Sequence, residues 1–325
     1  MAATHPNDRE FDCGTPIAGL AVPVMTDRGD AETGSLWLTL MPGLFVVLWS
    51  TGFIGAKLGL PYAEPLTFLT LRFAAAGLLL LIVTLAARAA WPKSWTETAH
   101  IAVAGLLLHG VYLGCVFAAI HHGVEAGVSA LIVCLQPLLV AAAAGPLLGE
   151  RVTRLQWLGL ALGIAGVVLV VWRKLELGLG TPLGVALCVI GLFGITAATL
   201  YQKRFCSHMP LRSGTVIQFA AAAAASGLVA LALESRVVVW SGAFVFALAW
   251  LVVVLSLGAF LLLYLLIRHG AAARVSSLFF LVPPCTALLA YPLFGERFGP
   301  VALAGMALVT LGVALVNLKG VNLKR

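Results

Sequence analysis

The sequence predicts an all-α integral membrane protein with ten transmembrane helices, arranged as two inverted five-helix repeats. Three observations predict this fold class: a composition suited to lipid, ten apolar segments of span length, and landmarks of the first half that recur in the second. Of the 325 residues, 61% are hydrophobic and 10% are charged, and the mean hydropathy is +1.05. A soluble domain carries about 25% charged residues, so lipid is the expected solvent.

Each predicted span is a run of about 20 apolar residues, enough to cross a hydrocarbon core of roughly 30 Å as a helix. The polar residues 1–35 are expected to form a disordered cytoplasmic tail without a removable signal peptide, and residues 319–325 a short basic C-terminal tail. The ten spans are 36–58, 66–88, 99–120, 126–148, 154–172, 180–202, 213–233, 243–267, 275–294 and 299–318.

The distribution of basic residues predicts the orientation of these spans. With the N-terminus in the cytoplasm, the cytoplasmic segments hold 14 Lys and Arg residues and the opposite connections hold five. Basic residues are enriched on the cytoplasmic side of membrane proteins. Both termini are therefore expected in the cytoplasm, in a multi-pass plasma (inner) membrane protein.

The second half of the chain repeats the first. At a constant offset Lys57 aligns with Lys203, and Gly149-Glu150-Arg151 aligns with Gly295-Glu296-Arg297. With one residue inserted, His122-Gly123 aligns with His269-Gly270. The repeats are expected over residues 36–173 and 180–318. Because five spans are an odd number, the second copy must enter the membrane from the opposite side, as in many secondary transporters.

These motifs resemble the EamA family of the drug/metabolite transporter superfamily. The resemblance rests on WSTGFIGAKLGLPYAEPLTFLTLRFAAA (Trp49–Ala76), on SALIVCLQPLL with GPLLGER, and on their echo in the second half. It implies ten helices, an inner-membrane carrier, and export of amino acids or related metabolites. The second copy departs from the pattern where Thr199 replaces Phe53 and Gln218 replaces Arg72.

Arg72 is the one charged residue well inside a predicted span. A charge at that depth costs several kcal/mol, so it usually faces a partner or a wet cavity. We predict that Arg72 anchors an anionic group such as a substrate carboxylate. The structural alternative is an arginine that snorkels to the interface or binds helix carbonyls.

Other polar or aromatic residues inside the spans are candidates for the same substrate site. Each has a packing alternative, and His109 could instead be a satisfied core histidine. Gln136 precedes Pro137, which breaks the helical hydrogen bonding, and Pro283-Pro284 does the same in the second repeat. The candidate substrate-binding residues are Trp49, Arg72, His109, Tyr112, Gln136, Gln218 and Tyr264.

Charged residues at helix ends are candidates for gates. Lys57, Lys203, Glu150 and Glu296 lie at the ends of predicted spans, where solvated ends and turn-forming caps are the alternatives. No Asp or Glu lies within a predicted span, although ion-coupled carriers usually place one there. Export is therefore expected to be either facilitated or coupled to protons through His109.

The predicted function is export of a small anionic or zwitterionic metabolite, with an amino acid favoured, by alternating access. A multidrug exporter, an intramembrane enzyme and a non-transporting scaffold are the alternatives. The six cysteines form no CxxC pair and no His cluster has metal-ligand spacing, so we expect no catalytic residues, metal or cofactor. The expected partners are the lipid bilayer and a small-molecule substrate, without nucleic acid; homodimerisation stays open.

Overall fold

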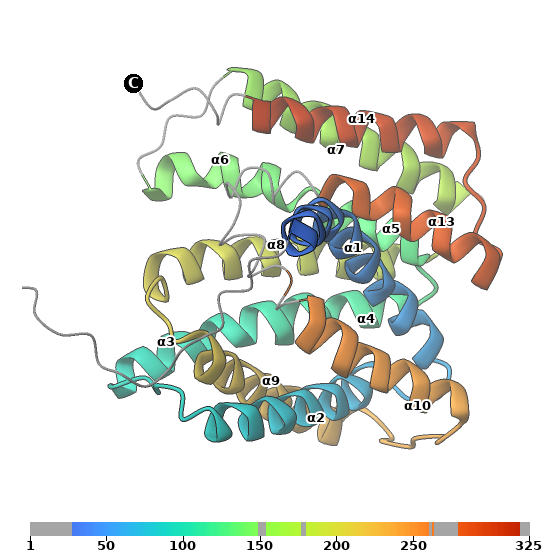
Figure 1. Cartoon of the computed structure of the whole chain (residues 1–325). Helices are drawn as coiled ribbons and strands as arrows, with labels where there is room; N and C mark the ends of the chain where they lie inside the picture. The colour runs from blue at the N-terminus through green and yellow to red at the C-terminus, as the bar shows by residue number, and fades with distance from the viewer. Residues whose placement is uncertain (1–27, 149–153, 177–179, 260–261, 263–278, 319–325) are drawn as a thin grey trace, which may run out of the picture. The chain divides into compact units, whose positions relative to one another are not determined.

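The fold is described from a computed structural model (Figure 1). The structure describes residues 28–148, 154–176, 180–259, 262 and 279–318. By contacts the chain divides after Thr39, and the packing described below concerns the unit that starts at Leu40.

The first half of the chain is a series of helices with short connections. Its third helical segment changes from α-helix to π-helix and back, and its fourth is interrupted. The elements are α1 (Arg28–Gly59), α2 (Pro65–Ala86), α3 (Trp95–Gly105), the π-helix η1 (Leu106–Leu113), α4 (Gly114–His121), α5 (Ala126–Val133), α6 (Gln136–Leu148) and α7 (Arg154–Glu176).

The second half follows the same order. Among the described residues, β pairing is limited to one isolated bridge between Ala63 and Val238. The elements are α8 (Pro182–Phe205), α9 (Leu211–Leu233), α10 (Gly242–Ala249), the π-helix η2 (Trp250–Ala259), the 3-10 turn η3 (Phe279–Leu281), α13 (Val282–Phe294) and α14 (Pro300–Leu318).

The all-helical prediction is confirmed, and part of the span prediction is confirmed with it. Within the described residues, six helical segments are long and apolar enough to cross a membrane: Leu40–Gly59, Pro65–Ala86, Trp95–His121, Pro182–Phe205, Leu211–Leu233 and Gly242–Ala259. Four shorter apolar helices in the same residues cover Ala126–Val140, Trp157–Trp172, Val282–Phe294 and Pro300–Gly312.

Two details differ from the predicted spans. The helix predicted over residues 126–148 is interrupted at Cys134 and Leu135, because Pro137 has no N–H to continue the ladder. Helix α1 begins at Arg28, ahead of the residue 36 at which the first span is predicted. Residues 263–278, which include the predicted end of one span and start of another, lie outside the described residues.

Local sequence signals explain where several helices begin. The side chains of Ser94, Thr181 and Ser241 each accept a hydrogen bond from a backbone N–H in the first turn of α3, α8 and α10. Helices α2 and α8 carry proline in the first turn, where its missing N–H costs nothing. Ser94 and Ser241 occupy the same position in the two repeats.

Equivalent helices of the two halves pack against each other, as α7 and α14 show (Figure 1). A Cβ added at Gly166 would lie 2.5 Å from the carbonyl oxygen of Gly305, and one added at Gly312 would lie 2.5 Å from that of Gly159. Residues later in α7 therefore face residues earlier in α14. The two helices run antiparallel and approach so closely that only glycine fits at these contacts.

The α2–α9 pair is antiparallel as well. Thr70 contacts Ser226 at 3.0 Å between hydroxyl oxygens, and the rings of Phe73 and Phe219 are stacked at 6.0 Å. A Cβ added at Gly77 would lie 3.3 Å from Cβ of Phe219. Thr70, early in α2, therefore faces Ser226, late in α9. Phe73 and Gly77, further along α2, face Phe219, which comes earlier in α9.

The α5–α13 pair follows the same rule. Its two ends are marked by contacts of Ala126 with Glu296, just after α13, and of Cys134 with Phe279, just before it. The α7–α14 and α2–α9 pairs each join a helix to its own repeat equivalent in the opposite direction, as a pseudo-two-fold axis between the halves requires. Helices α5 and α13 belong to the predicted spans 126–148 and 275–294, which are equivalent in the two repeats, and they also run in opposite directions.

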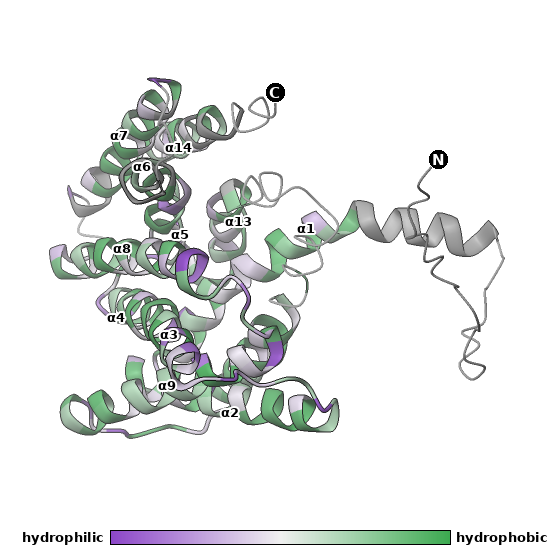
Figure 2. Ribbon diagram, turned by 90° about the vertical axis from the view of Figure 1, so that its left-hand side faces the viewer, coloured by the Kyte–Doolittle hydropathy of each residue, from purple (hydrophilic) through white to green (hydrophobic). Residues whose placement is uncertain are grey.

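The outer surfaces of the helices are apolar. Figure 2 shows hydrophobic colour along most helices from α2 to α14, with hydrophilic colour mainly at helix ends and connections. Large apolar side chains such as Leu78, Ile82, Val168 and Phe193 are exposed. In water such surfaces would associate, and a bilayer solvates them.

Candidate functional site

Arg72 lies in the middle of α2 and is buried, with 5% of its surface exposed. Its Nε donates a hydrogen bond of 3.3 Å to Oγ of Ser256 on η2, and its guanidinium lies 5.9 Å from the centre of the Phe73 ring. Helix α2 belongs to the first repeat and η2 to the second. Arg72 therefore spans the boundary between the halves inside the bundle, and it does not snorkel to an interface.

His109 and Tyr112 lie on η1 and are buried at 2% and 5% exposure. The His109 ring lies 5.4 Å from the Phe73 ring and 4.9 Å from the Phe219 ring, between centroids. The Phe73 ring thus lies near both Arg72 and His109. The structure brings together Arg72 and Phe73 of α2 with His109 of η1.

Gln136 and Gln218, the two amide candidates, have different surroundings. Gln136, at the start of α6, donates from Nε2 to Oγ1 of Thr199 on α8 at 3.0 Å. Gln218 on α9 is 4% exposed and contacts Sδ of Met209 at 3.9 Å. A Cβ added at Gly105 would lie 2.6 Å from Cα of Gln218, so α9 packs closely where α3 continues into η1.

Trp49, on α1, forms part of an aromatic cluster. Its ring lies 5.3 Å from that of Phe45 and 5.2 Å from that of Phe279, the latter edge to face. Phe279 lies just before α13, so the cluster joins the two repeats. Tyr264 and Glu150 lie outside the described residues.

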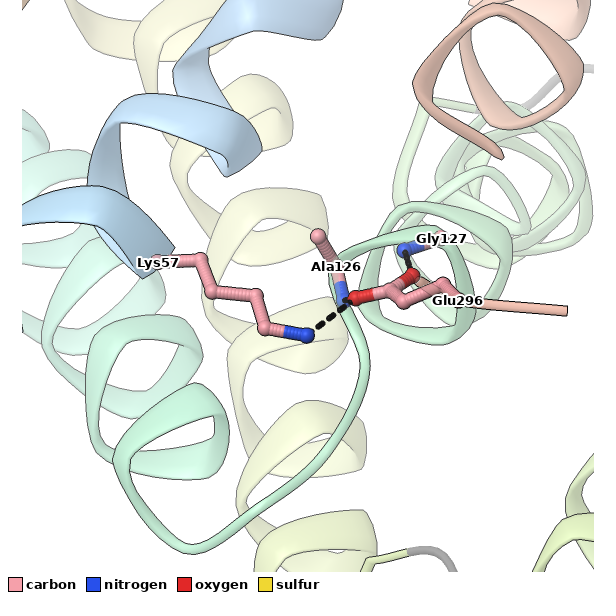
Figure 3. Close-up of polar contacts among 4 residues, drawn as sticks. All are labelled: Lys57, Ala126, Gly127 and Glu296. Atoms are coloured by element: carbon pink, nitrogen blue, oxygen red, sulfur yellow. Dashed lines mark hydrogen bonds and ion pairs between the residues drawn. The ribbon is translucent and has the colours of Figure 1, made fainter. Parts of the chain in front are cut away.

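Lys57 and Glu296 form an ion pair between the repeats (Figure 3). Nζ of Lys57, at the end of α1, donates to Oε1 of Glu296 at 2.6 Å. The same carboxylate accepts hydrogen bonds from the backbone N–H groups of Ala126 (2.9 Å) and Gly127 (3.3 Å) at the start of α5. The Glu296 side chain is 2% exposed and that of Lys57 is 28% exposed.

Glu296 is therefore neither a solvated helix end nor a cap of its own helix. Its charge is balanced by a lysine and by the positive end of the α5 dipole. Removal of either partner would leave a poorly compensated buried charge. Lys203, the repeat equivalent of Lys57, is exposed in the last turn of α8.

Two more glutamates join the repeats at this end of the bundle. Glu234, at the end of α9, accepts hydrogen bonds from the N–H groups of Leu66 (2.8 Å) and Thr67 (2.7 Å) at the start of α2. Ser235 donates from its hydroxyl and its N–H to Glu64, which holds the pKa of the Glu64 carboxyl below its ordinary value. These bonds connect the segment after α1 to the segment after α9.

The five connections predicted on the outer side all meet in this way. Oγ1 of Thr181, before α8, donates to the carbonyl of His122, before α5, at 3.1 Å. This contact joins the connections after the third and fifth predicted spans. The Lys57–Glu296 contact joins those after the first and ninth spans, and the Glu64–Ser235 contact joins those after the first and seventh. At the opposite end Ser213 donates to the carbonyl of Ala90 at 2.6 Å.

Among the described residues, two of the cavities near the surface have walls that do not include Arg72 or His109. One, of about 380 Å³, is lined by residues of the segment Trp91–Thr98 with Ile217. The other, of about 150 Å³, lies between α1 and α10 with Thr51, Gly55 and Trp250 in its wall. Arg72, His109, Tyr112 and Gln218 are buried, whereas Trp49 and Gln136 are half-buried.

Sequence reasoning missed Ser256 and Glu234. A serine in an apolar helix commonly bonds to its own backbone, so Ser256 gives no signal by itself. Its alignment with His109 in the repeat is the signal that could have found it. Glu234 ends a helix like many solvated glutamates, and its target in α2 is distant in sequence.

The fold and these contacts define a multi-pass membrane protein built from a duplicated helical unit. The chain belongs to the EamA-like transporter family, whose model matches residues 36–172 and again residues 182–318. The resemblance drawn from the sequence motifs is thereby confirmed.

Several relatives of the chain are named as transporters. The chain is 27% identical over 286 residues to the "Uncharacterized inner membrane transporter YedA" of Escherichia coli K12, covering 86% of this chain and 91% of that protein. It is also 27% identical to the "Uncharacterized transporter YvbV" of Bacillus subtilis, with the same coverage. A "Probable amino-acid metabolite efflux pump" of Escherichia coli K12 is 26% identical over 165 residues, 51% of this chain and 53% of that protein.

Similarity to a solved structure supports the fold. A structure described as "Crystal structure of protein" superposes with a TM-score of 0.62 at 22% identity, covering 86% of this chain and 96% of the other. The fold is therefore one that also occurs in a solved structure.

Proposed function

We propose that this protein exports a small anionic or zwitterionic metabolite, with amino acids as the favoured class, by alternating access across the inner membrane. Membership of a transporter family, with the family unit present twice, is the observation that carries the proposal. The efflux-pump relatives support the substrate class. We further propose that the chain crosses the membrane ten times and has both termini in the cytoplasm.

The antiparallel pairing of equivalent helices supports an inverted arrangement. If α7 and α14 both cross the bilayer, their opposite directions require the two repeats to insert with opposite orientation. Such a pair of halves can rock about a central site and expose it to one side at a time. The six long and four shorter apolar helices provide ten candidate crossings.

In this proposal the buried residues at the repeat boundary form the substrate site. Arg72 supplies positive charge inside the bundle, and Phe73 and Phe219 supply apolar surface beside it. His109, Tyr112, Gln136, Gln218 and Trp49 lie on the segments that would separate as the halves rock, and Tyr264 is retained as a sequence-based candidate. A guanidinium binds carboxylates with paired, charge-assisted hydrogen bonds.

The Lys57–Glu296 pair closes one end of the path in this proposal. It joins α1, α5 and the connection after α13, and thus both repeats, at the side predicted to be external. Because this contact joins the repeats and both Arg72 and His109 are buried, the described conformation corresponds to a state closed at this end. Lys203 and Glu150 remain candidates for the opposite end.

A drug exporter and an enzyme have less support. Among the described residues, each Asp or Glu from Leu40 onward lies at a helix end or in a connection, so no acid within a span would pair with a cationic drug. The EamA-like relatives are named as transporters, not enzymes.

A counterflow experiment tests the proposal. Purified protein in liposomes is preloaded with each of the common amino acids in turn, and uptake of the labelled compound is measured. We expect transient accumulation of one or more amino acids, absent from protein-free liposomes. A lack of counterflow for every amino acid, with folded protein in the liposomes, would contradict the assigned substrate class.

Repeating the assay over a range of pH tests the coupling. If His109 carries protons, His109→Ala should flatten the pH dependence of transport. An unchanged pH dependence in this variant would leave facilitated export as the mechanism.

A further inference from the structure

Ser256 holds a place in the bundle that the substrate site described above does not include. It lies on η2 and is 2% exposed. Its Oγ accepts the 3.3 Å hydrogen bond from Nε of Arg72 and donates one of 2.9 Å to the carbonyl of Leu251. The three groups form a chain in which the arginine donates, the hydroxyl relays and the backbone accepts.

The π-helical turn determines which carbonyl accepts from Ser256. Two other buried serines, Ser50 and Ser226, donate to the carbonyl four residues earlier, that of Val46 and that of Ala222. Ser256 bonds to a carbonyl five residues earlier. With its hydrogen committed to Leu251, the hydroxyl has only lone pairs to offer Arg72. π-Helical turns are often found at functional sites.

In the first repeat, His109 on η1 takes the place that Ser256 has on η2 in the second repeat. The N-cap serines Ser94 and Ser241 align the third segments of the two repeats, and this alignment places Ser256 at the position of His109. Both residues lie on a π-helix, η1 or η2. Just as α2 packs on η2, α9 packs on η1, with Phe219 against His109.

The cation is present in only one of these two arrangements, because Gln218 stands at the position of Arg72. One positive anchor in a pseudo-symmetric site fits a substrate with one carboxylate.

We propose that Ser256 is a positioning residue that fixes the guanidinium of Arg72 for end-on binding of a substrate carboxylate. Among the residues that the structure describes, Ser256 is the one hydrogen-bond partner of the Arg72 side chain. It occupies Nε, so the two terminal amino groups, Nη1 and Nη2, are the pair left to grip both oxygens of a carboxylate. This inference rests on the proposed function and specifies how its site recognises an acid.

The main experiment compares an acid with its carboxamide. The probe pair is the amino acid with the largest counterflow signal and the carboxamide of the same amino acid. We expect Ser256→Ala to raise KM for the acid about three- to tenfold, the effect of one ordinary hydrogen bond. KM for the carboxamide should stay within about twofold, and Ser256→Thr, which keeps the hydroxyl, should restore much of the acid selectivity.

A double-mutant cycle separates positioning from packing. If Ser256 acts through Arg72, Ser256→Ala should have no further effect on acid selectivity in an Arg72→Gln background. An equal rise in KM for acid and carboxamide, or an additive effect in the cycle, would overturn the inference and leave the proposed function standing.

A spectroscopic readout does not depend on transport. The Nε–H signal of Arg72 in a ¹⁵N correlation spectrum can be assigned by its loss in Arg72→Gln. We expect this signal to shift and to exchange faster with water in Ser256→Ala. An unchanged signal would refute the contact, whereas failure of counterflow for all amino acids with a shifted signal would refute the proposed function alone.

Discussion

Replacing Arg72 by alanine is expected to raise KM for amino acids roughly 10- to 150-fold. Charge-assisted hydrogen bonds of a buried guanidinium contribute about 1.5–3 kcal/mol, and each 1.4 kcal/mol is about a factor of ten. Counterflow of each amino acid and its carboxamide measures the effect. The carboxamide should lose far less, because it carries no negative charge.

Two variants control this experiment. Arg72→Lys keeps the charge but not the planar fork, so its effect should lie between those of the wild type and alanine. Gln218→Ala removes a buried polar side chain from the equivalent position of α9 and should not discriminate acid from carboxamide. If Arg72→Ala reduces transport of both probes equally, Arg72 has a structural role and does not anchor a carboxylate.

Cross-linking residue 57 to residue 296 is expected to stop transport almost completely. In the Lys57→Cys/Glu296→Cys variant, a cleavable bifunctional thiol reagent would replace the ion pair by a covalent link between the repeats. Because we propose that this contact must open during each cycle, the linked protein should be inactive and regain activity on reduction. The assay is counterflow before treatment, after treatment and after reduction.

The single-cysteine variants and the parent protein, treated with the same reagent, control for reaction with native cysteines. The parent retains buried cysteines such as Cys134 and Cys188, which the reagent should reach slowly. Transport by the linked protein at the rate of the unlinked variant would show that Lys57 and Glu296 form a static cap.

Much of this fold could be predicted because the sequence repeats itself at places where physics restricts the residue. Gly159 and Gly166 align with Gly305 and Gly312, and the structure brings each into contact with a glycine of the other set. The burial of Arg72 could be predicted because a lone charge in an apolar span needs a protein environment.

The pairing of distant residues could not be predicted in the same way. Lys57 and Glu296 each look like an ordinary helix end, and their contact depends on how two repeats pack across 239 positions of sequence. Thr199 stands where the first repeat has Phe53, and this difference in sequence does not indicate what the threonine hydroxyl contacts. In the structure the hydroxyl of Thr199 accepts a hydrogen bond from Gln136.

The π-helices are a further limit of sequence reasoning. Residues 99–120 predict one regular helix, and Trp95–His121 is indeed helical throughout. No proline marks the switch to π-helix at Leu106, and the presence of His109 and Gly110 within η1 does not by itself predict a π-helix. The orientation of His109 and Ser256 therefore depends on tertiary packing of η1 and η2.

The orientation of equivalent connections tests the inverted-repeat arrangement most directly. Single cysteines at Arg154, at the start of α7, and at Arg297, just after α13, are labelled with a membrane-impermeant maleimide from each side of sealed vesicles. Both positions are exposed. The arrangement predicts that residue 154 reacts only from the cytoplasmic side and residue 297 only from the opposite side. Labelling of both from the same side would contradict it.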